Sequence, residues 1–301
     1  MRRLIAVLAL AAACAPTPAA VPAPRTASLE AELRRIVAGA GASTEVSVAF
    51  RDLATGDSVV LDGDRSMHAA STMKVPVMLE LFRRADAGEL RMDAPIEVRN
   101  SFRSIADGST YSLDRADDSD STLYRRLGER VPLATLVEAM ITRSSNLATN
   151  LLIDLAEPRR IAATLEGLGA GGVRVLRGVE DGPAYAAGMN NTTTACGLMR
   201  VMEGIASGRA ASPASTREML AILGRQEFRE MIPGGLPAGV RSANKTGNIT
   251  AIAHDAAIVF PEGRAPYVLV VLTRGFPRSA DAASVARDIS RAVYRHVTTP
   301  R

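Results

Sequence analysis

The chain has 301 residues, of which 47% are hydrophobic and 23% are charged, an ordinary composition for a globular protein. The 36 basic and 32 acidic residues leave a formal net charge of +4. The basic residues are scattered along the sequence, and no segment combines clustered basic residues with aromatic ones. Nucleic acid binding therefore has little support. Two distant Cys and three scattered His form no metal-ligand cluster, so we expect no metal site and no cofactor.

Residues 1–14 are expected to form an export signal peptide. Two Arg follow Met1, and the apolar run from Leu4 to Ala13 is too short to span a bilayer. The run ends at Cys14 in a weak lipoprotein cleavage box, so lipidation of Cys14 and cleavage by a standard signal peptidase are both open. Residues 15–27, rich in Pro and Ala, are typical of an extended linker. We therefore expect an exported, periplasmic protein, either soluble or anchored to a membrane by a lipid on Cys14.

The expected elements follow in chain order. A helix over 28–38 precedes a hairpin with alternating apolar residues over 46–50 and 59–61. A strongly apolar helix then starts at Ser71 and ends at Gly88. The middle of the chain is predicted to hold two loops, a polar surface loop over 100–123 and a long ordered loop over 173–191. Helices are expected over 133–141, 147–155, 161–168 and 213–223, and a further helix, capped by 192–194, runs to 205. Strand-like runs over 239–246, 249–260 and 267–272 come before an amphipathic helix over 283–297.

This order predicts an α+β fold with one antiparallel sheet. Its strands come from both ends of the chain and are flanked by helices, while an all-helical lobe over about 70–225 is inserted between them. Residues 28–301 would then form one catalytic domain with two lobes, and ligand sites tend to lie between such lobes.

The two lysines stand out among the basic residues. All other basic residues are Arg, and the lysines are Lys74 and Lys245. Arg stays protonated at working pH, whereas a partly buried Lys changes its pKa readily and can accept a proton. These two positions are therefore the first candidates for catalytic residues. The alternative is that a coding bias toward Arg left two lysines by chance.

Three short motifs include these lysines and a segment between them: Ser71-x-x-Lys74, Ser144-Ser145-Asn146 and Lys245-Thr246-Gly247. Alone, the first is weak, because Ser242-x-x-Lys245 matches it too. Ser71 opens a helix, however, where residues three apart share a face, whereas Ser242 lies on a predicted strand and is interpreted as a decoy. In isolation, Ser144 and Asn146 could simply cap a helix. The three motifs together, in this order, are strong evidence for a catalytic site.

With these motifs, the sequence resembles the penicillin-recognising serine hydrolases, in particular the class A β-lactamases. The resemblance runs from about residue 28 to the end and includes the order of strands and helices, so it implies the β-lactamase/D,D-peptidase-like fold. The implied substrate is a β-lactam or a cell-wall peptide, and we expect a monomer.

The residue types suit acyl transfer. Ser71 would attack a carbonyl and become acylated, and Lys74 would take or relay its proton. Ser144 would pass a proton to the departing nitrogen, and Asn146 would bind a substrate amide and orient Lys74.

Two further residues are expected to bind the substrate carboxylate: Lys245 by its charge and Thr246 by its hydroxyl. The resemblance also implies an oxyanion hole made by the backbone N–H groups of Ser71 and Asn248. A cation that assists carboxylate binding has no motif, and Arg229 and Arg241 are both open.

The middle motif departs from the family's pattern, because Ser145 stands where the family usually carries an Asp. The local hydrogen bonding around it is therefore expected to differ.

The loop that would supply the deacylating base also departs from that pattern. Glu180 is the candidate base, but it lies three residues after Arg177 instead of two. Ala184 takes the place of an Asn, and Asn191 takes the place of the Asp that pairs with the loop Arg. The alternative interpretation of Glu180 is a solvated loop carboxylate.

Three functions remain open at this point. The first is a class A-like serine β-lactamase, with Glu180 activating water against the acyl-enzyme. The second is a D,D-peptidase or related penicillin-binding acyl-enzyme hydrolase or esterase with slow deacylation. The third is a non-catalytic binder that keeps the fold.

Overall fold

The computed structural model describes residues 25–299. The predicted signal peptide, Cys14 and most of the predicted linker lie outside the described residues. The first helix, α1 (Arg25–Gly39), begins earlier than expected, so residues 25–27 belong to the folded domain and not to the linker. Within residues 25–299, no helix is long and apolar enough to cross a membrane.

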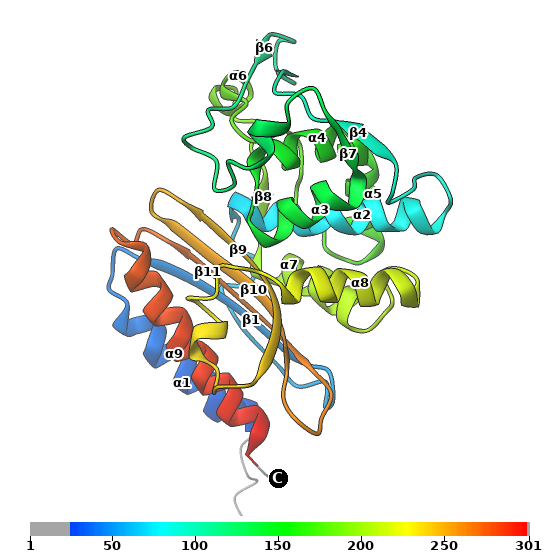
Figure 1. Ribbon diagram of the computed structural model, residues 1–301. Coiled ribbons are helices and arrows are strands. Elements are labelled where there is room, and N and C mark those ends of the chain that lie inside the picture. Colours follow the sequence, from blue (N-terminus) through cyan, green and yellow to red (C-terminus); the bar gives the residue numbers. More distant parts are fainter. Residues whose placement is uncertain (1–24, 300–301) are drawn as a thin grey trace, which may run out of the picture.

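A five-stranded antiparallel sheet forms the centre of one lobe, as predicted (Figure 1). Its strand order is β2-β1-β11-β10-β9, so strands from the two ends of the chain lie side by side. The strands are β1 (Glu45–Asp52), β2 (Ser58–Leu61), β9 (Arg241–Ile249), β10 (Ile252–Phe260) and β11 (Tyr267–Arg274). Strand β9 is at the edge and presents Lys245-Thr246-Gly247 to the other lobe.

Both faces of the sheet are covered. Helices α1 and α9 (Ser279–Thr298) pack on one face, and α7 (Ala195–Ala206) packs on the other (Figure 1). Because β10 and β11 are enclosed on both sides, nearly every residue in them is buried. This explains why neither strand alternates between apolar and polar residues: β11 is almost entirely apolar, and β10 is apolar except for the buried His254 and Asp255.

The second lobe is mainly helical and lies between β2 and β9 in the chain. Its helices are α2 (Lys74–Asp86), α3 (Leu133–Thr142), α4 (Asn146–Ala156) and α5 (Pro158–Gly167), and α8 (Pro213–Gly224) packs against both α2 and β9. The prediction of an entirely helical lobe was wrong in detail. Short antiparallel pairs join β4 (Pro95–Glu97) to β7 (Arg130–Pro132) and β5 (Phe102–Arg103) to β6 (Thr110–Tyr111).

The long segment predicted as a loop over 173–191 contains one short helix, α6 (Gly182–Ala186). It is followed by β8 (Thr192–Thr193), which pairs with β3 (Met67–His68) just ahead of Ser71. Three 3₁₀ turns complete the fold: η1 (Ala70–Met73), η2 (Leu123–Arg126) and η3 (Pro233–Gly235).

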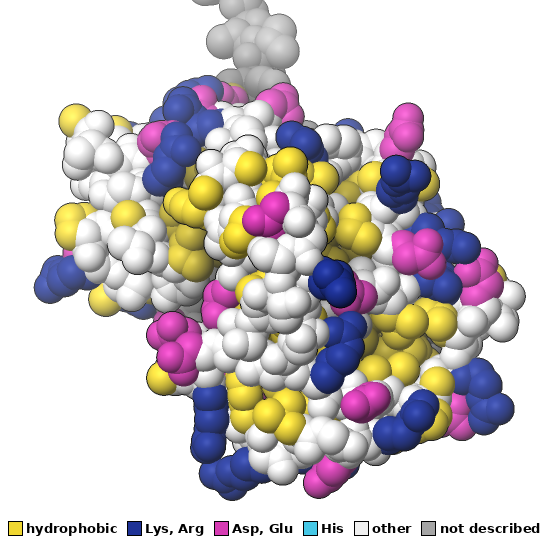
Figure 2. All heavy atoms as spheres, turned by 90° about the horizontal axis from the view of Figure 1, so that it is seen from above, with side chains coloured by type: hydrophobic (Ala, Val, Ile, Leu, Met, Phe, Trp, Pro, Cys, Tyr) yellow, Lys and Arg dark blue, Asp and Glu magenta, His cyan; other side chains and the backbone are white. Residues whose placement is uncertain are grey.

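The surface of the helical lobe carries charges of both signs. Seen from above in Figure 2, basic and acidic side chains are interspersed among polar and apolar ones. Several exposed arginines form ion pairs, such as Arg126 with Glu129 and Arg99 with Asp154. Such exposed pairs contribute little stability individually, so the fold depends mainly on its two apolar cores.

Candidate active site

Ser71 lies in the tight turn η1, which leads directly into α2. The predicted α-helix therefore begins at Lys74, and a 3₁₀ turn carries Ser71 ahead of it. Strand β9 passes close to this turn at Gly247, where an added Cβ would lie 3.0 Å from the Ser71 nitrogen. A side chain at this position would crowd the turn, so glycine favours the close approach. Within residues 25–299 no group hydrogen-bonds the Ser71 hydroxyl, which lines the cleft between the lobes.

Lys74 is fully buried beneath this turn. Its Nζ donates to the Ser144 carbonyl oxygen (2.6 Å), to Ser144 Oγ (3.1 Å) and to Asn146 Oδ1 (3.0 Å). Burial lowers the pKa of Lys74 to about 7, and the nearby carboxylates of Asp118 and Glu180 oppose that shift. A substantial fraction of Lys74 is therefore neutral near pH 7 and able to accept a proton.

Both candidate lysines donate a hydrogen bond to the Ser144 hydroxyl oxygen. Lys245 Nζ donates to Ser144 Oγ (3.1 Å), the same oxygen that Lys74 contacts, and to the Thr246 carbonyl oxygen (2.8 Å). With two donors on its oxygen, the Ser144 hydroxyl can direct its own hydrogen elsewhere. Burial lowers the pKa of Lys245 strongly, and the charge of Lys74 lowers it further. Ser144 has a left-handed backbone (φ 58°), a strained conformation for a residue with a side chain.

The start of α4 shows the hydrogen bonds around Ser145, which stands where the family's pattern usually has an Asp. Ser145 caps the helix, its side chain accepting from the Ala148 N–H. The buried carboxylate of Asp118 accepts from the N–H groups of Asn146 (2.9 Å) and Leu147 (2.8 Å). Asp118 was missed because it stands in a Ser- and Asp-rich stretch that predicted only a surface loop.

Glu180 reaches the same cluster. Asn146 Nδ2 donates to Glu180 Oε1 at 3.4 Å, so the Asn146 amide lies between Lys74 and Glu180. Although Glu180 is exposed, partial desolvation in the loop raises its pKa, while hydrogen bonds from the Asp114 backbone and Asn146 oppose the rise. Glu180 also has a left-handed backbone, with φ 61°. The structure thus brings the candidate base to the site despite its shifted spacing.

A buried amide holds the backbone beside Glu180. Asn150 Oδ1 accepts from the Val179 N–H (2.6 Å), and Asn150 Nδ2 donates to the Val179 carbonyl oxygen (3.0 Å). On the other side, Asp181 accepts from Ser104 Oγ (2.6 Å) and the Ile105 N–H (3.0 Å). Asn150 was not predicted, although it lies one helical turn after Asn146, where residues share a face.

The partner of the loop Arg differs from the prediction. Arg177 donates its Nη2 to Asn190 Oδ1 (3.1 Å), whereas Asn191 Oδ1 accepts from the backbone N–H groups of Leu176 and Arg177. The side chain that meets the guanidinium is therefore Asn190 and not Asn191. Among the described residues, Arg177 forms no ion pair within 4.0 Å, and burial lowers its pKa.

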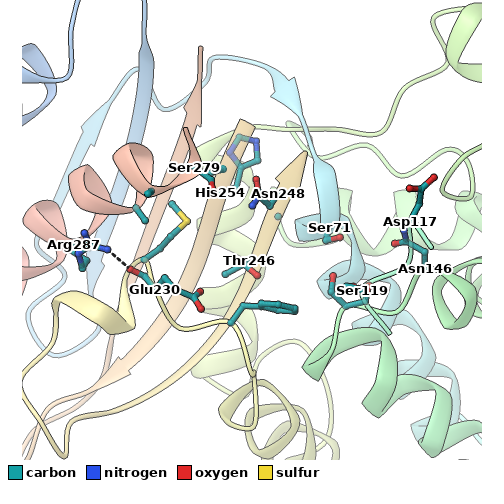
Figure 3. A pocket seen from close by; sticks show the side chains of 17 residues that line it. Ser71, Asp117, Ser119, Asn146, Glu230, Thr246, Asn248, His254, Ser279 and Arg287 are labelled. Atoms are coloured by element: carbon teal, nitrogen blue, oxygen red, sulfur yellow. Dashed lines mark hydrogen bonds between the residues drawn. The ribbon is translucent and has the colours of Figure 1, made fainter. Parts of the chain in front are cut away.

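A cleft of about 610 Å³ connects these groups with the far lobe. Figure 3 shows Ser71, Asn146 and Asp117 at one end, Thr246 and Asn248 between, and Ser279 and Arg287 of α9 at the other end. The remaining lining residues are Ser119, Ser144, Phe228, Glu230, Met231, Gly247, Ala253, His254, Ala280 and Ala283.

The cation in this cleft is neither of the two considered from the sequence. Arg229 Nη2 donates to Ser242 Oγ, and the Arg241 guanidinium lies over the Phe260 ring at 5.2 Å. Arg287 is the only basic residue among the cleft-lining residues of the part of the chain that the structure describes. No motif marks it, because its sequence context indicates only one turn of an amphipathic helix.

Comparison with known proteins agrees with this architecture. Residues 28–297 match the β-lactamase enzyme family, and the chain belongs to that family. A β-lactamase of Streptomyces fradiae is 29% identical over 243 residues, which cover 78% of this chain and 75% of that protein. The β-lactamase CTX-M-8 of Citrobacter amalonaticus is 24% identical over 257 residues, covering 84% and 83% of the two chains.

Solved structures give the same result for the fold. The β-lactamase of Sphaerobacter thermophilus matches with a TM-score of 0.76 and 27% identity, over 89% of this chain and 96% of that one. The structure of PBP-A matches with a TM-score of 0.76 and 24% identity, over 89% and 95%, and at that identity it supports the fold alone. The predicted family and α+β fold are confirmed.

Proposed function

We propose that this protein is a serine hydrolase of the class A β-lactamase type, which opens the β-lactam amide through an acyl-enzyme on Ser71. The observation that carries the proposal is the shared contact of Lys74 and Lys245 with Ser144 Oγ, beside a Ser71 hydroxyl that lines the cleft. Membership of the β-lactamase family supports it.

In the proposed acylation, Ser71 Oγ attacks the lactam carbonyl and its proton passes to neutral Lys74. The developing oxyanion would be held by the backbone N–H groups of Ser71 and Asn248, where the absence of a side chain at Gly247 lets the strand approach. The C–N bond then breaks, the nitrogen receives the proton of Ser144, and Lys74 returns a proton to Ser144 across their 3.1 Å contact. Lys74 and Ser144 thus regain their starting protonation states, and Ser71 is left as an ester.

Substrate binding is assigned to the residues around this centre. Lys245 and Thr246 would hold the substrate carboxylate from β9, and Asn146 would hold an amide from α4. In deacylation, Glu180 would take a proton from a water molecule that attacks the ester. Its raised pKa suits a group that must accept a proton, because it strengthens the base.

A penicillin-binding D,D-peptidase is the second candidate, and one observation favours it. The only hydrogen bond from a side chain to Glu180 is the 3.4 Å contact from Asn146, among the residues that the structure describes. A loosely held base would deacylate slowly. The substrate would then be a cell-wall peptide, and β-lactams would remain attached to Ser71.

Labelling with a fluorescent penicillin separates the candidates. The β-lactamase proposal predicts a transient label that disappears as the penicillin is consumed, while the D,D-peptidase predicts a persistent label that a D-Ala-D-Ala peptide competes away. If the folded protein takes up no label and releases no penicilloate, both enzyme proposals fail and the fold serves as a binder.

The acylation rate is expected to depend on the protonation of Lys74. Because its pKa is about 7 and the neutral amine accepts the proton, the rate of labelling should rise as pH increases through about 7. The rise should be about tenfold from pH 6 to the plateau. Lys74→Arg should lose acylation at every pH, since Arg stays protonated. Stopped-flow labelling across pH measures this, and a flat profile would remove Lys74 as the base.

Arg287 is proposed to attract the anionic end of the substrate. It lines the end of the cleft beyond Thr246, and its Nη1 donates to the Glu230 carbonyl oxygen (3.1 Å). We expect Arg287→Ala to raise KM for anionic β-lactams several-fold with little change in kcat, and added salt should shrink the difference. Arg291, which pairs with Asp288 on the same helix and does not line the cleft, is the matched control. Equal KM values for the Arg287→Ala and Arg291→Ala variants would contradict this role.

Export is part of the proposal. We propose that residues 1–14 direct the chain to the periplasm, that a Pro- and Ala-rich linker follows, and that the domain acts there as a monomer. Whether Cys14 carries a lipid is a separate question, which mass spectrometry of the mature N-terminus answers.

A further inference from the structure

Two histidines outside the three motifs connect the turn of Ser71 to the central sheet. His254 lies on β10 opposite Gly247 of β9 and is fully buried at the base of the cleft (Figure 3). His68 lies on β3, three residues before Ser71. Neither has a part in the mechanism proposed above.

The contacts of His254 determine its tautomer. Its Nδ1 accepts from the Thr273 N–H (3.1 Å), and a backbone amide can only donate there, so Nδ1 carries no hydrogen. The hydrogen of the neutral ring is therefore on Nε2, which donates to the His68 carbonyl oxygen (3.0 Å). Burial also lowers the pKa of His254 to about 4, which keeps the ring neutral.

The next contact reaches the residue before Ser71. His68 Nδ1 accepts from the Ala70 N–H (3.0 Å), and the Ala69 N–H donates to the Asn191 carbonyl oxygen (2.9 Å). Ala70 has φ 45°, a left-handed conformation that is strained for alanine and persists only when its surroundings hold it. The backbone direction at Ala70 determines where the Ser71 N–H points.

We propose that His254 and His68 are positioning residues, which hold the strained turn at Ala70 and so direct the Ser71 backbone N–H and hydroxyl toward the reacting carbonyl. The series of hydrogen bonds runs from the Thr273 N–H of β11 through the His254 ring to the His68 carbonyl oxygen. It continues from the His68 ring to the Ala70 N–H. This inference rests on the proposal that Ser71 is acylated.

Two substitutions at His254 separate its two contacts. His254→Asn can keep an acceptor for the Thr273 N–H but loses the donor to His68. His254→Gln can place an N–H near the position of Nε2 and so keeps the donor, while it loses the acceptor. A role limited to the sheet would make His254→Gln the worse variant, whereas a positioning role makes His254→Asn the worse one.

The measurement is the second-order rate constant for labelling by a fluorescent penicillin, with the melting temperature recorded for each variant. We expect His254→Asn to acylate about 10- to 100-fold more slowly than wild type, because small misplacements at a reacting centre have effects of that size. His254→Gln should remain within a few-fold of wild type. If both variants acylate at the wild-type rate, or if acylation follows the melting temperature alone, the proposal is overturned.

His68 provides a second pair, in case the fully buried His254 does not tolerate substitution. His68 is only partly buried, and His68→Asn can keep an acceptor for the Ala70 N–H, whereas His68→Leu cannot. We expect His68→Leu to acylate at least tenfold more slowly and His68→Asn to recover most of the rate. Equal rates for the two would overturn the proposal. Wild-type protein that takes up no label would instead contradict the proposed function.

Discussion

Replacing Ser71 by alanine is expected to abolish β-lactam hydrolysis and covalent labelling together. In the proposed mechanism the Ser71 hydroxyl supplies the oxygen of the ester, so its removal leaves no site for the adduct. Removing the nucleophilic serine of a serine protease lowers kcat by roughly 10⁶-fold, and a loss of that order is expected here. The change removes one oxygen that has no hydrogen-bond partner in the described part of the chain, so the fold should be unaffected. A chromogenic cephalosporin and mass spectrometry of the intact protein measure both effects.

The matched control is Ser242→Ala. Ser242 also stands three residues before a Lys, but it lies on β9 and accepts a hydrogen bond from Arg229. We expect this variant to retain most of its turnover. If Ser71→Ala still forms an adduct, or if Ser242→Ala loses one, Ser71 is not the nucleophile.

Replacing Glu180 by glutamine is expected to trap the acyl-enzyme. Acylation depends on Ser71 and Lys74 and should change by no more than several-fold. Deacylation depends on a carboxylate that takes a proton from water, and its loss should slow that step by roughly 10²–10⁴-fold. Glutamine has nearly the same shape, so the contact with Asn146 and the left-handed backbone at this position can persist. The ester should then accumulate and be visible as a stable mass increase.

Glu157→Gln is the control for this variant. Glu157 has the same φ of 61° in the same lobe and is exposed, as Glu180 is, but it pairs with Arg84, whereas Glu180 is contacted by Asn146. It should turn over like wild type. Unchanged steady-state turnover in Glu180→Gln would remove Glu180 from the mechanism and make it the solvated loop carboxylate of the alternative interpretation.

Those parts of the fold that depend on long local patterns were predictable. The runs of β10 and β11 and the amphipathic helix at the C-terminus extend over many residues, so their periodicity is clear. The pairing of β3 with β8 involves only two residues on each strand, which is too short for any period. Helix α6 lies in a stretch rich in Gly and Pro, which favours a loop, and Asp181 stabilises it by accepting from the Ala184 N–H.

The residues of the site likewise divide into those that the sequence predicts and those that it does not. Ser71 and Lys74 were predictable because they are close in sequence and one turn places them together. Asp118 and Arg287 contribute from segments distant in sequence, and Asn150 lies one turn after Asn146, but the local context of all three indicates only a loop or an ordinary helix face. Asp118 in particular accepts from the first two N–H groups of α4, beside the cap that Ser145 provides. Such contacts depend on tertiary packing, which one sequence does not display.

The balance between acylation and release is most directly tested by mixing the mature wild-type protein with a large molar excess of a chromogenic cephalosporin. Hydrolysis should continue through many turnovers per enzyme, with an acyl adduct that is present during the reaction and gone when the substrate is consumed. Colour release that stops after one molecule per enzyme, with the adduct remaining on Ser71, would contradict the proposal that Glu180 releases the acyl-enzyme.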